Sequence, residues 1–196
     1  MIIIRITGGL GNQMFQYAFG KRIAALRNTM LKLDVTTFGK YKGETSRDYS
    51  LDSFNVEQQF AKPSEISAFQ KEGIVSRLAQ RVGFLVGSCI REYGTKFSKK
   101  YLSARNNTYL IGYWQSEDYF KEIRSDLLKE FTLKGDCSDA YFEFKEEIKN
   151  VNSVSLHIRR TDYLQKNQSN EFLQFLGLEY YIKAINYLRK NHKNMH

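Results

Sequence analysis

The sequence predicts an α/β fold built on a parallel sheet. Residues 2–6 form a β-branched apolar run of strand length, residues 13–27 repeat apolar side chains at helical spacing, and residues 30–34 form a second short apolar segment. Parallel neighbours must be joined by a crossover, usually a helix. A strand, a glycine-rich connection, a helix and a second strand are therefore typical of the opening of a parallel sheet.

The composition is that of a folded domain. The chain has 196 residues, of which 42% are hydrophobic and 26% are charged, close to the averages of globular proteins. This length is enough for one domain or one and a half, at about 100–200 residues per domain. No apolar run approaches the roughly 18 residues that span a bilayer, and the first residues lack the pattern of a signal peptide. We therefore expect a cytoplasmic protein that at most touches the inner face of the membrane.

The charge points to an anionic partner. Thirty Lys and Arg against 21 Asp and Glu give a formal net charge of +9. Nucleic acid, phospholipid headgroups and a nucleotide diphosphate all suit such a charge. The basic residues are scattered in runs no longer than two, which argues against nucleic acid. The two cysteines, Cys89 and Cys137, have no metal-ligand spacing around them, so neither a zinc site nor a disulfide framework is indicated.

The middle of the chain contains fewer clear elements. Residues 38–53 are polar and predict a surface excursion. Pro63 is typical of the start of a helix, and the stretch 66–86 is compatible with that helix. Residues 108–114 predict the next strand, and Ser116 is placed to cap a helix that follows it.

The last part predicts a further helix at 138–149, a strand at 151–158 and an amphipathic helix at 178–192. A helix that follows a strand in this kind of fold delivers the next parallel strand. The sequence contains no such strand, so we expect a unit that is incomplete.

The glycine-rich segment 8–13 connects the first predicted strand to the first predicted helix. Backbone N–H groups at the start of a helix favour an anion or a polar ligand, and glycine allows the ligand to come close. The dinucleotide fingerprint is incomplete because Met14 stands where its last glycine belongs, although Asp34 lies about where a ribose-binding acid is expected. A tight turn with a positive φ angle is the alternative. The candidate ligand-contacting residues are Gly9, Gly11, Asn12 and Gln13.

The segment 157–163 follows the strand predicted at 151–158. Open α/β sheets bind ligands at the carboxyl ends of their strands. Arg159 and Arg160 could donate paired hydrogen bonds to a diphosphate there, and Asp162 could orient a guanidinium group. Two arginines after a strand are more often simply solvated, and a histidine within a strand, such as His157, is more often buried and hydrogen-bonded than catalytic.

Four segments together resemble, in order and spacing, the bacterial α-1,2-fucosyltransferases of glycosyltransferase family 11. They are GGLGNQMFQYA at residues 8–18, RDYSLD at 47–52, GYWQS at 112–116 and HIRRTDY at 157–163. The resemblance implies inverting transfer of L-fucose from GDP-fucose to a sugar hydroxyl, usually the 2-hydroxyl of a galactose, without a metal or another cofactor. The acceptor would be an oligosaccharide or a lipid-linked glycan, as in O-antigen synthesis.

The same resemblance implies a GT-B-like fold of two Rossmann-like lobes. Residues 1–150 would form the N-terminal lobe on the acceptor side, and residues 151–196 the start of an incomplete GDP-fucose-binding lobe. Arg160 would hold the β-phosphate of GDP, with Arg159 and Asp162 shaping the pocket. Gly9, Gly11 and Asn12 would line the cleft near the donor from the N-terminal lobe. His157 and Asp162 are candidates for the base that takes the acceptor proton, on their location alone.

Two other functions remain open from the sequence. One is a catalytically inactive remnant of such an enzyme, since family members continue beyond the last predicted helix. The other is a basic nucleic-acid-binding domain, which the charge permits and the scattered basic residues disfavour.

Overall fold

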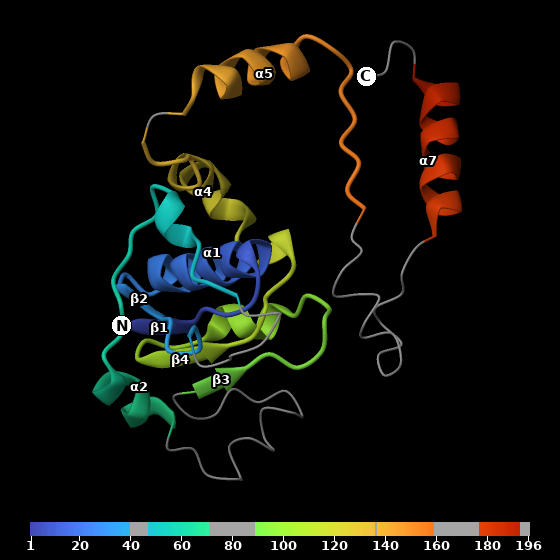
Figure 1. Ribbon diagram of the computed structural model, residues 1–196. Coiled ribbons are helices and arrows are strands. Elements are labelled where there is room, and N and C mark those ends of the chain that lie inside the picture. The colour runs from blue at the N-terminus through green and yellow to red at the C-terminus, as the bar shows by residue number, and fades with distance from the viewer. Residues whose placement is uncertain (40–46, 71–88, 136, 159–176, 193–196) are drawn as a thin grey trace. The chain divides into compact units, whose positions relative to one another are not determined.

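The computed structural model describes residues 1–39, 47–70, 89–135, 137–158 and 177–192. The chain divides into two compact units, Met1–Lys134 and Gly135–His196 (Figure 1). Each unit is described by itself below.

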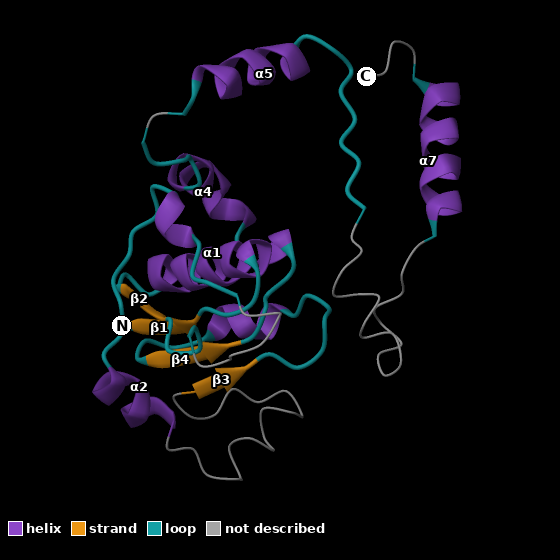
Figure 2. Ribbon diagram, in the orientation of Figure 1, coloured by secondary structure: helices purple, strands orange, loops and turns teal. Residues whose placement is uncertain are grey.

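A four-stranded sheet forms the centre of the first unit (Figure 2). Its strands are β1 (Ile2–Arg5), β2 (Leu31–Asp34), β3 (Cys89–Arg91) and β4 (Thr108–Ile111). All pairs are parallel and the spatial order is β2-β1-β4-β3. The predicted parallel α/β sheet is thus confirmed, and it is compatible with a Rossmann-like lobe. The two-lobed GT-B arrangement stays a prediction.

Helix α1 (Leu10–Leu26) begins three residues before the start predicted at Gln13. Gly8 makes the turn out of β1 with φ at +81°. Gly9 is the extended residue that precedes the helix, and its carbonyl accepts the first helical hydrogen bond, from the Gln13 N–H, at 3.1 Å. Glycine is unfavourable inside a helix, which is why the segment predicts a loop. In the first turn the N–H groups have no helical partner in any case, and Gly11 is tolerated there.

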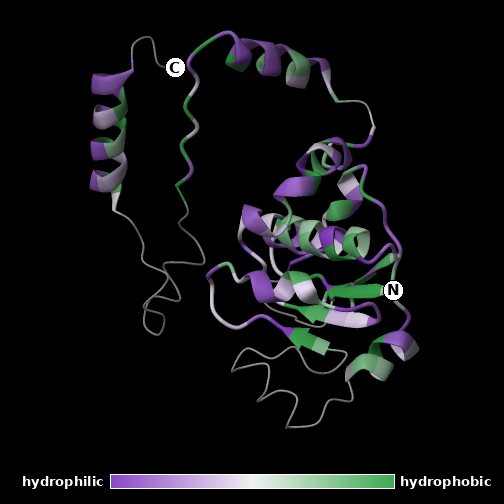
Figure 3. Ribbon diagram, turned by 180° about the vertical axis from the view of Figure 1, so that it is seen from behind, coloured by the Kyte–Doolittle hydropathy of each residue, from purple (hydrophilic) through white to green (hydrophobic). Residues whose placement is uncertain are grey.

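The core lies on both faces of the sheet. Side chains alternate along a strand, so Ile2, Ile4 and Ile6 face α1 whereas Ile3 faces the other side. Ile3 packs with Ile66 of α2 (Pro63–Gln70), and the strands are strongly apolar in Figure 3. Burial on both faces explains why the strands appear in the sequence as continuous apolar runs.

Gly20 allows α1 to lie close to the sheet. A Cβ atom at this position would stand 2.8 Å from Leu31 Cδ1 and 2.9 Å from Ile4 Cγ2. Any side chain here would therefore force the helix away from β1 and β2.

The predicted helix start at Pro63 is confirmed. Proline at the first helical position loses no hydrogen bond, and the Glu65 carboxylate accepts a hydrogen bond from the Lys62 N–H at 2.8 Å. The rest of the predicted helix, residues 71–86, lies outside the described residues, as do 40–46 of the polar excursion. Strand β3 is an element that the sequence did not predict.

The single helix predicted after Ser116 is wrong. Two short 3₁₀-helices, Glu117–Tyr119 and Lys121–Ile123, precede α4 (Arg124–Glu130). The predicted cap is confirmed, since Ser116 Oγ accepts a hydrogen bond from the Asp118 N–H. The interruption falls at Phe120, which has φ −144° and ψ 13° and whose ring contacts Phe15 with centroids 5.8 Å apart. Core packing of this side chain overrides the helical pattern.

The second unit contains α5 (Asp139–Lys149) and α7 (Leu178–Asn191), which confirm both helices predicted there. Ser138 caps α5 by accepting a hydrogen bond from the Tyr141 N–H at 3.3 Å. The strand predicted at 151–158 is wrong, because this segment is not a strand and most of it is exposed. A parallel strand needs a neighbour, and every strand in the described part of the chain lies in the first unit. No helix in the described ranges is long and apolar enough to cross a membrane.

Candidate functional site

The candidate site lies at the carboxyl edge of the sheet, beyond the ends of β1 and β4. The chain leaves β1 towards β2 on one side, whereas β4 and β3 lie on the other side. Such a change of direction is where open α/β sheets bind ligands. Two segments meet at this point, Thr7–Gly9 after β1 and Gly112–Gln115 after β4. The glycine-rich motif and the GYWQS motif are thus brought together.

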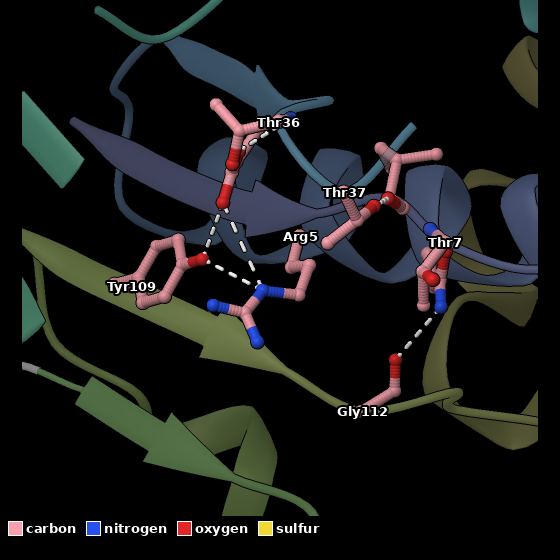
Figure 4. A network of polar contacts seen from close by, with 9 residues as sticks. Arg5, Thr7, Thr36, Thr37, Tyr109 and Gly112 are labelled. Atoms are coloured by element: carbon pink, nitrogen blue, oxygen red, sulfur yellow. Dashed lines mark hydrogen bonds and ion pairs between the residues drawn. The ribbon is translucent and has the colours of Figure 1, made fainter. Parts of the chain in front are cut away.

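Gln16 connects these two segments. Its side chain is fully buried, Oε1 accepts a hydrogen bond from the Thr7 N–H at 2.9 Å, and Nε2 donates one to the Gly112 carbonyl at 3.0 Å (Figure 4). One amide group on the first turns of α1 therefore fixes the spacing between the ends of β1 and β4.

Asn12 and Gln115 make a second connection nearer to the solvent. Gln115 Nε2 donates a hydrogen bond to Asn12 Oδ1 at 2.7 Å. Tyr113, two residues before Gln115 in the chain, is 48% exposed. A Cβ atom at Gly9 or Gly11 would have no atom within 4 Å, so the space over the start of α1 is open. This part of the edge offers amides, backbone and an aromatic ring to a polar ligand.

Gln13 is buried and supports a third segment. Its Nε2 donates hydrogen bonds to the carbonyls of Gly8 at 2.9 Å and Asp48 at 2.8 Å, and its Oε1 accepts one from the Ser50 N–H at 2.9 Å. The RDYSLD motif therefore reaches the same edge. The side-chain amide of Gln13 is used by the backbone here, so a contact from it to a ligand stays a prediction.

Asp34 is buried at the end of β2 and belongs to a polar network with Arg5 and Tyr109 (Figure 4). Tyr109 donates a hydrogen bond to Asp34 Oδ2 at 2.5 Å, and Arg5 Nε donates one to the Tyr109 oxygen at 2.9 Å. Asp34 Oδ1 accepts from the Thr36 N–H at 2.9 Å. Burial first, and then the bond to Asp34, raises the pKa of Tyr109 well above its usual value. Asp34 thus connects β2, β1 and β4 within the fold. Its carboxylate is engaged by these contacts, in agreement with the incomplete dinucleotide fingerprint, which also lacks its last glycine.

The sequence also singled out four residues of the arginine-rich segment 157–163 as site residues. Arg159, Arg160 and Asp162 lie outside the described residues. His157 is exposed in the extended stretch of the second unit. The roles of these four residues therefore stay predictions. Within the described ranges no three His, Cys, Asp or Glu side chains gather in a way that could hold a metal ion.

Sequence reasoning missed Glu92 at this site. Its carboxylate Oε2 accepts hydrogen bonds from the N–H groups of Tyr113 at 2.7 Å and Trp114 at 2.8 Å. An acidic residue at the carboxyl end of a strand is a signal for such a role, but the three-residue β3 is too short to be found by its pattern. Gln16 was part of a quoted motif and was not singled out either.

Comparison with known proteins places this α/β chain in a family of glycosyltransferases. Residues 88–196, more than half of the chain, match the model of Glycosyl transferase family 11. This chain belongs to that family.

Two curated relatives from Escherichia coli match most or all of the chain. One is named Alpha-1,2-colitosyltransferase and is 33% identical over 196 residues, covering 100% of this chain and 66% of the relative. The other is named O-antigen biosynthesis glycosyltransferase WbnK and is 29% identical over 203 residues, covering 93% of this chain and 66% of the relative. The chain thus spans somewhat less than two thirds of the length of each relative. No solved structure matches significantly.

Proposed function

We propose that this protein transfers L-fucose from GDP-fucose to a sugar hydroxyl, the 2-hydroxyl of a galactose, during synthesis of a glycan such as O-antigen. The observation that carries the proposal is the meeting of three motif segments at the carboxyl edge of the parallel sheet, in a chain that belongs to glycosyl transferase family 11. The names of the two relatives support glycosyl transfer and a place in O-antigen synthesis.

In the proposed reaction, the acceptor oxygen attacks the anomeric carbon while the bond from that carbon to the GDP oxygen breaks. The configuration inverts, GDP leaves with the bonding electrons, and the acceptor proton passes to a base. Arg160, helped by Arg159, would stabilise the charge that develops on the diphosphate, so no metal is required. His157 and Asp162 are our candidates for the base.

The edge of the first unit would hold the acceptor. Asn12 and Gln115 offer amide groups to sugar hydroxyls. Tyr113, which precedes Trp114 in the turn after β4, offers an exposed aromatic ring. Gly9 and Gly11 leave open space over the helix start, through which a ligand can approach the backbone.

A transfer assay tests the proposal. The chain is incubated with GDP-fucose and a galactoside, and release of GDP is followed with and without the acceptor. Arg160→Ala should lower turnover by on the order of 100-fold or more if the guanidinium stabilises the leaving group. Arg189→Ala, which removes an exposed arginine from α7, is the matched control and should leave turnover unchanged. Undiminished turnover in Arg160→Ala would contradict the assignment of this arginine.

A colitosyl donor is the second candidate, favoured by the relative named Alpha-1,2-colitosyltransferase. Colitose is L-fucose without its 3-hydroxyl group, so the two donors differ by one hydrogen-bonding group. A site that binds this hydroxyl can reject the donor that lacks it by a factor of about 10⁴. Assays of GDP-fucose and GDP-colitose in parallel decide between the two donors, and no GDP release from either would refute the proposed function.

A further inference from the structure

The turn that follows β4 has an unusual backbone at Trp114. This residue has a φ of +55°, in the left-handed region that a bulky side chain rarely adopts. Such a conformation persists only where the surroundings determine it strongly, and it is found preferentially at functional sites. The turn also carries Tyr113 and Gln115, the two residues that this side of the candidate site presents.

The Trp114 side chain is held in the core. It is fully buried, and its ring stacks on Phe19 with centroids 4.0 Å apart. Tyr101 and Tyr119 contact the ring edge-on, at centroid distances of 5.0 Å and 5.8 Å. This packing fixes the side chain, but the backbone of the turn needs its own hydrogen-bond partners.

Glu92 supplies those partners. Its N–H donates to the Ile111 carbonyl at 2.8 Å, which extends the pairing of β3 with β4 by one residue. Its carboxylate then accepts from the backbone N–H groups of both Tyr113 and Trp114 through one oxygen, Oε2. Hydrogen bonds to an ionised acceptor are the stronger kind, and two at one atom fix its place closely.

Gly112 makes room for this carboxylate. A Cβ atom at position 112 would stand 2.5 Å from Glu92 Cβ and 2.8 Å from Glu92 Oε2. The Glu92 side chain therefore crosses directly over the glycine. The carbonyl of the same glycine accepts from Gln16, so the turn is tied on one side to β3 and on the other to α1.

We propose that Glu92 is a positioning residue of the acceptor site. It holds the turn so that Trp114 points into the core while Tyr113 stays exposed and Gln115 reaches Asn12. Glu92 acts through these residues and does not itself contact the sugar. The inference rests on the proposed function, because it assigns to Glu92 a part in binding the acceptor of that reaction.

The experiment uses the whole chain and three variants. Trp114 is its one tryptophan, so its fluorescence reports directly on the turn. Glu92→Ala removes both hydrogen bonds. Glu92→Gln keeps an oxygen that can accept them. Glu117→Ala removes an exposed carboxylate elsewhere, whose side chain is 64% exposed and pairs with Arg124, and serves as the matched control.

We expect Glu92→Ala to shift the Trp114 emission to longer wavelength and to raise the acceptor KM about tenfold with a smaller change in kcat. Tenfold corresponds to releasing the backbone of about one ordered residue. Glu92→Gln should restore both emission and KM, and Glu117→Ala should alter neither. If Glu92→Ala does not fold by far-UV circular dichroism, Glu92→Asp takes its place, since its shorter side chain cannot reach both N–H groups.

The outcomes separate the two proposals. An active wild type with an unchanged KM in Glu92→Ala overturns the role of Glu92, whether or not the emission moves. A KM that rises equally in Glu92→Ala and Glu92→Gln also overturns it, because the hydrogen bonds would not be the cause. A wild type that releases no GDP from either sugar donor overturns the proposed function, and the positioning role falls with it.

Discussion

The two units of this chain bury their side chains to very different extents. In the first unit Ile2, Ile3 and Ile4 are completely buried, and α1 and α2 cover the two faces of the sheet. In the second unit, none of the described residues is buried, and large apolar side chains such as Phe144 and Tyr187 are 61% and 68% exposed. In Figure 3 hydrophobic colour predominates on the strands, whereas α5 and α7 carry both hydrophobic and hydrophilic colour.

The difference teaches which interactions hold each unit. Helices close their hydrogen bonds within one segment, so α5 and α7 form from local signals such as the Ser138 cap. Isolated helices of this length are marginal in water, because most helix stability in proteins comes from packing. The first unit has that packing, and its stability should therefore be cooperative whereas that of α5 and α7 should be local.

Hydrogen exchange should show the largest contrast. We expect the amides of β1 and β4 to exchange on the order of 1000-fold more slowly than those of α5 and α7, because they open only with the whole first unit. Exchange followed by mass spectrometry on peptides from each element measures this ratio. Equal protection in α5 and β1 would show that the second unit shares a cooperative core.

Removing core volume should matter only in the first unit. Ile4→Ala should cost about 2–5 kcal/mol of the free energy of unfolding, because the side chain is buried between β1 and α1. Ile182→Ala in α7, at a side chain that is 56% exposed, should stay within about 0.5 kcal/mol. Urea unfolding followed by Trp114 emission and by circular dichroism gives both values. Similar losses in the two variants would contradict the contrast.

Gln16 tests the same contrast at a buried polar group. Gln16→Leu leaves the Thr7 N–H and the Gly112 carbonyl without their partner, which should cost about 1–3 kcal/mol. Gln59→Leu, at an exposed glutamine whose bond to Glu57 is 3.2 Å long, should change the free energy of unfolding little. Urea midpoints at a fixed pH provide the comparison. An unchanged urea midpoint in Gln16→Leu would mean that water takes over the hydrogen bonds to Thr7 and Gly112.

The smallest expected effect is the change in the free energy of unfolding when acid pH protonates the carboxylates of two ion pairs. The hydrogen bond from Lys32, and then that from the Lys62 N–H, lowers the pKa of Glu65 below its usual value of 4.5. Lys149 likewise lowers the pKa of Glu146 in α5. A lowered pKa contributes stability above the unfolded pKa, and this contribution is lost as the pH falls through the folded one.

Glu65→Gln should therefore lower the free energy of unfolding at about pH 7 and leave it unchanged at about pH 2. Glu146→Gln should have a smaller effect, because the Glu146 side chain is 63% exposed against 23% for Glu65 and ion pairs in solvent are weak. Unfolding curves recorded across the acid range measure both. A larger effect for Glu146 would place α5 in a more protected setting than its exposure indicates.

The same distinction explains what the sequence could predict. The elements with local signals were found: the start at Pro63, the helix predicted at 138–149 and the helix from Leu178. Elements that depend on a neighbour were not. Strand β3 has three residues and no pattern of its own, and it forms by pairing with β4. The segment 151–158 has a strand pattern, yet it forms no strand among the described residues.

The candidate site divides in the same way. Its location after β1 followed from the glycines and from the free N–H groups at the start of the predicted helix. The contacts that shape it join residues far apart in sequence: Gln16 and Gly112 are separated by 96 positions, and Asn12 and Gln115 by 103. A single sequence carries no signal for such pairs, nor for the approach of Glu92 to the turn after β4.

Gly20 links the packing of α1 to the hydrogen bonds of Gln16, so few substitutions should be tolerated at this position. It lies one helical turn after Gln16, on the same face of α1. Even a methyl group at position 20 would meet Ile4 and Leu31 at less than 3 Å, so the helix would have to rise. Gln16 would move with the helix. Its hydrogen bonds to the Thr7 N–H at 2.9 Å and to the Gly112 carbonyl at 3.0 Å would then be lost. Substitutions of Gly20 should therefore disturb the candidate site before they unfold the protein.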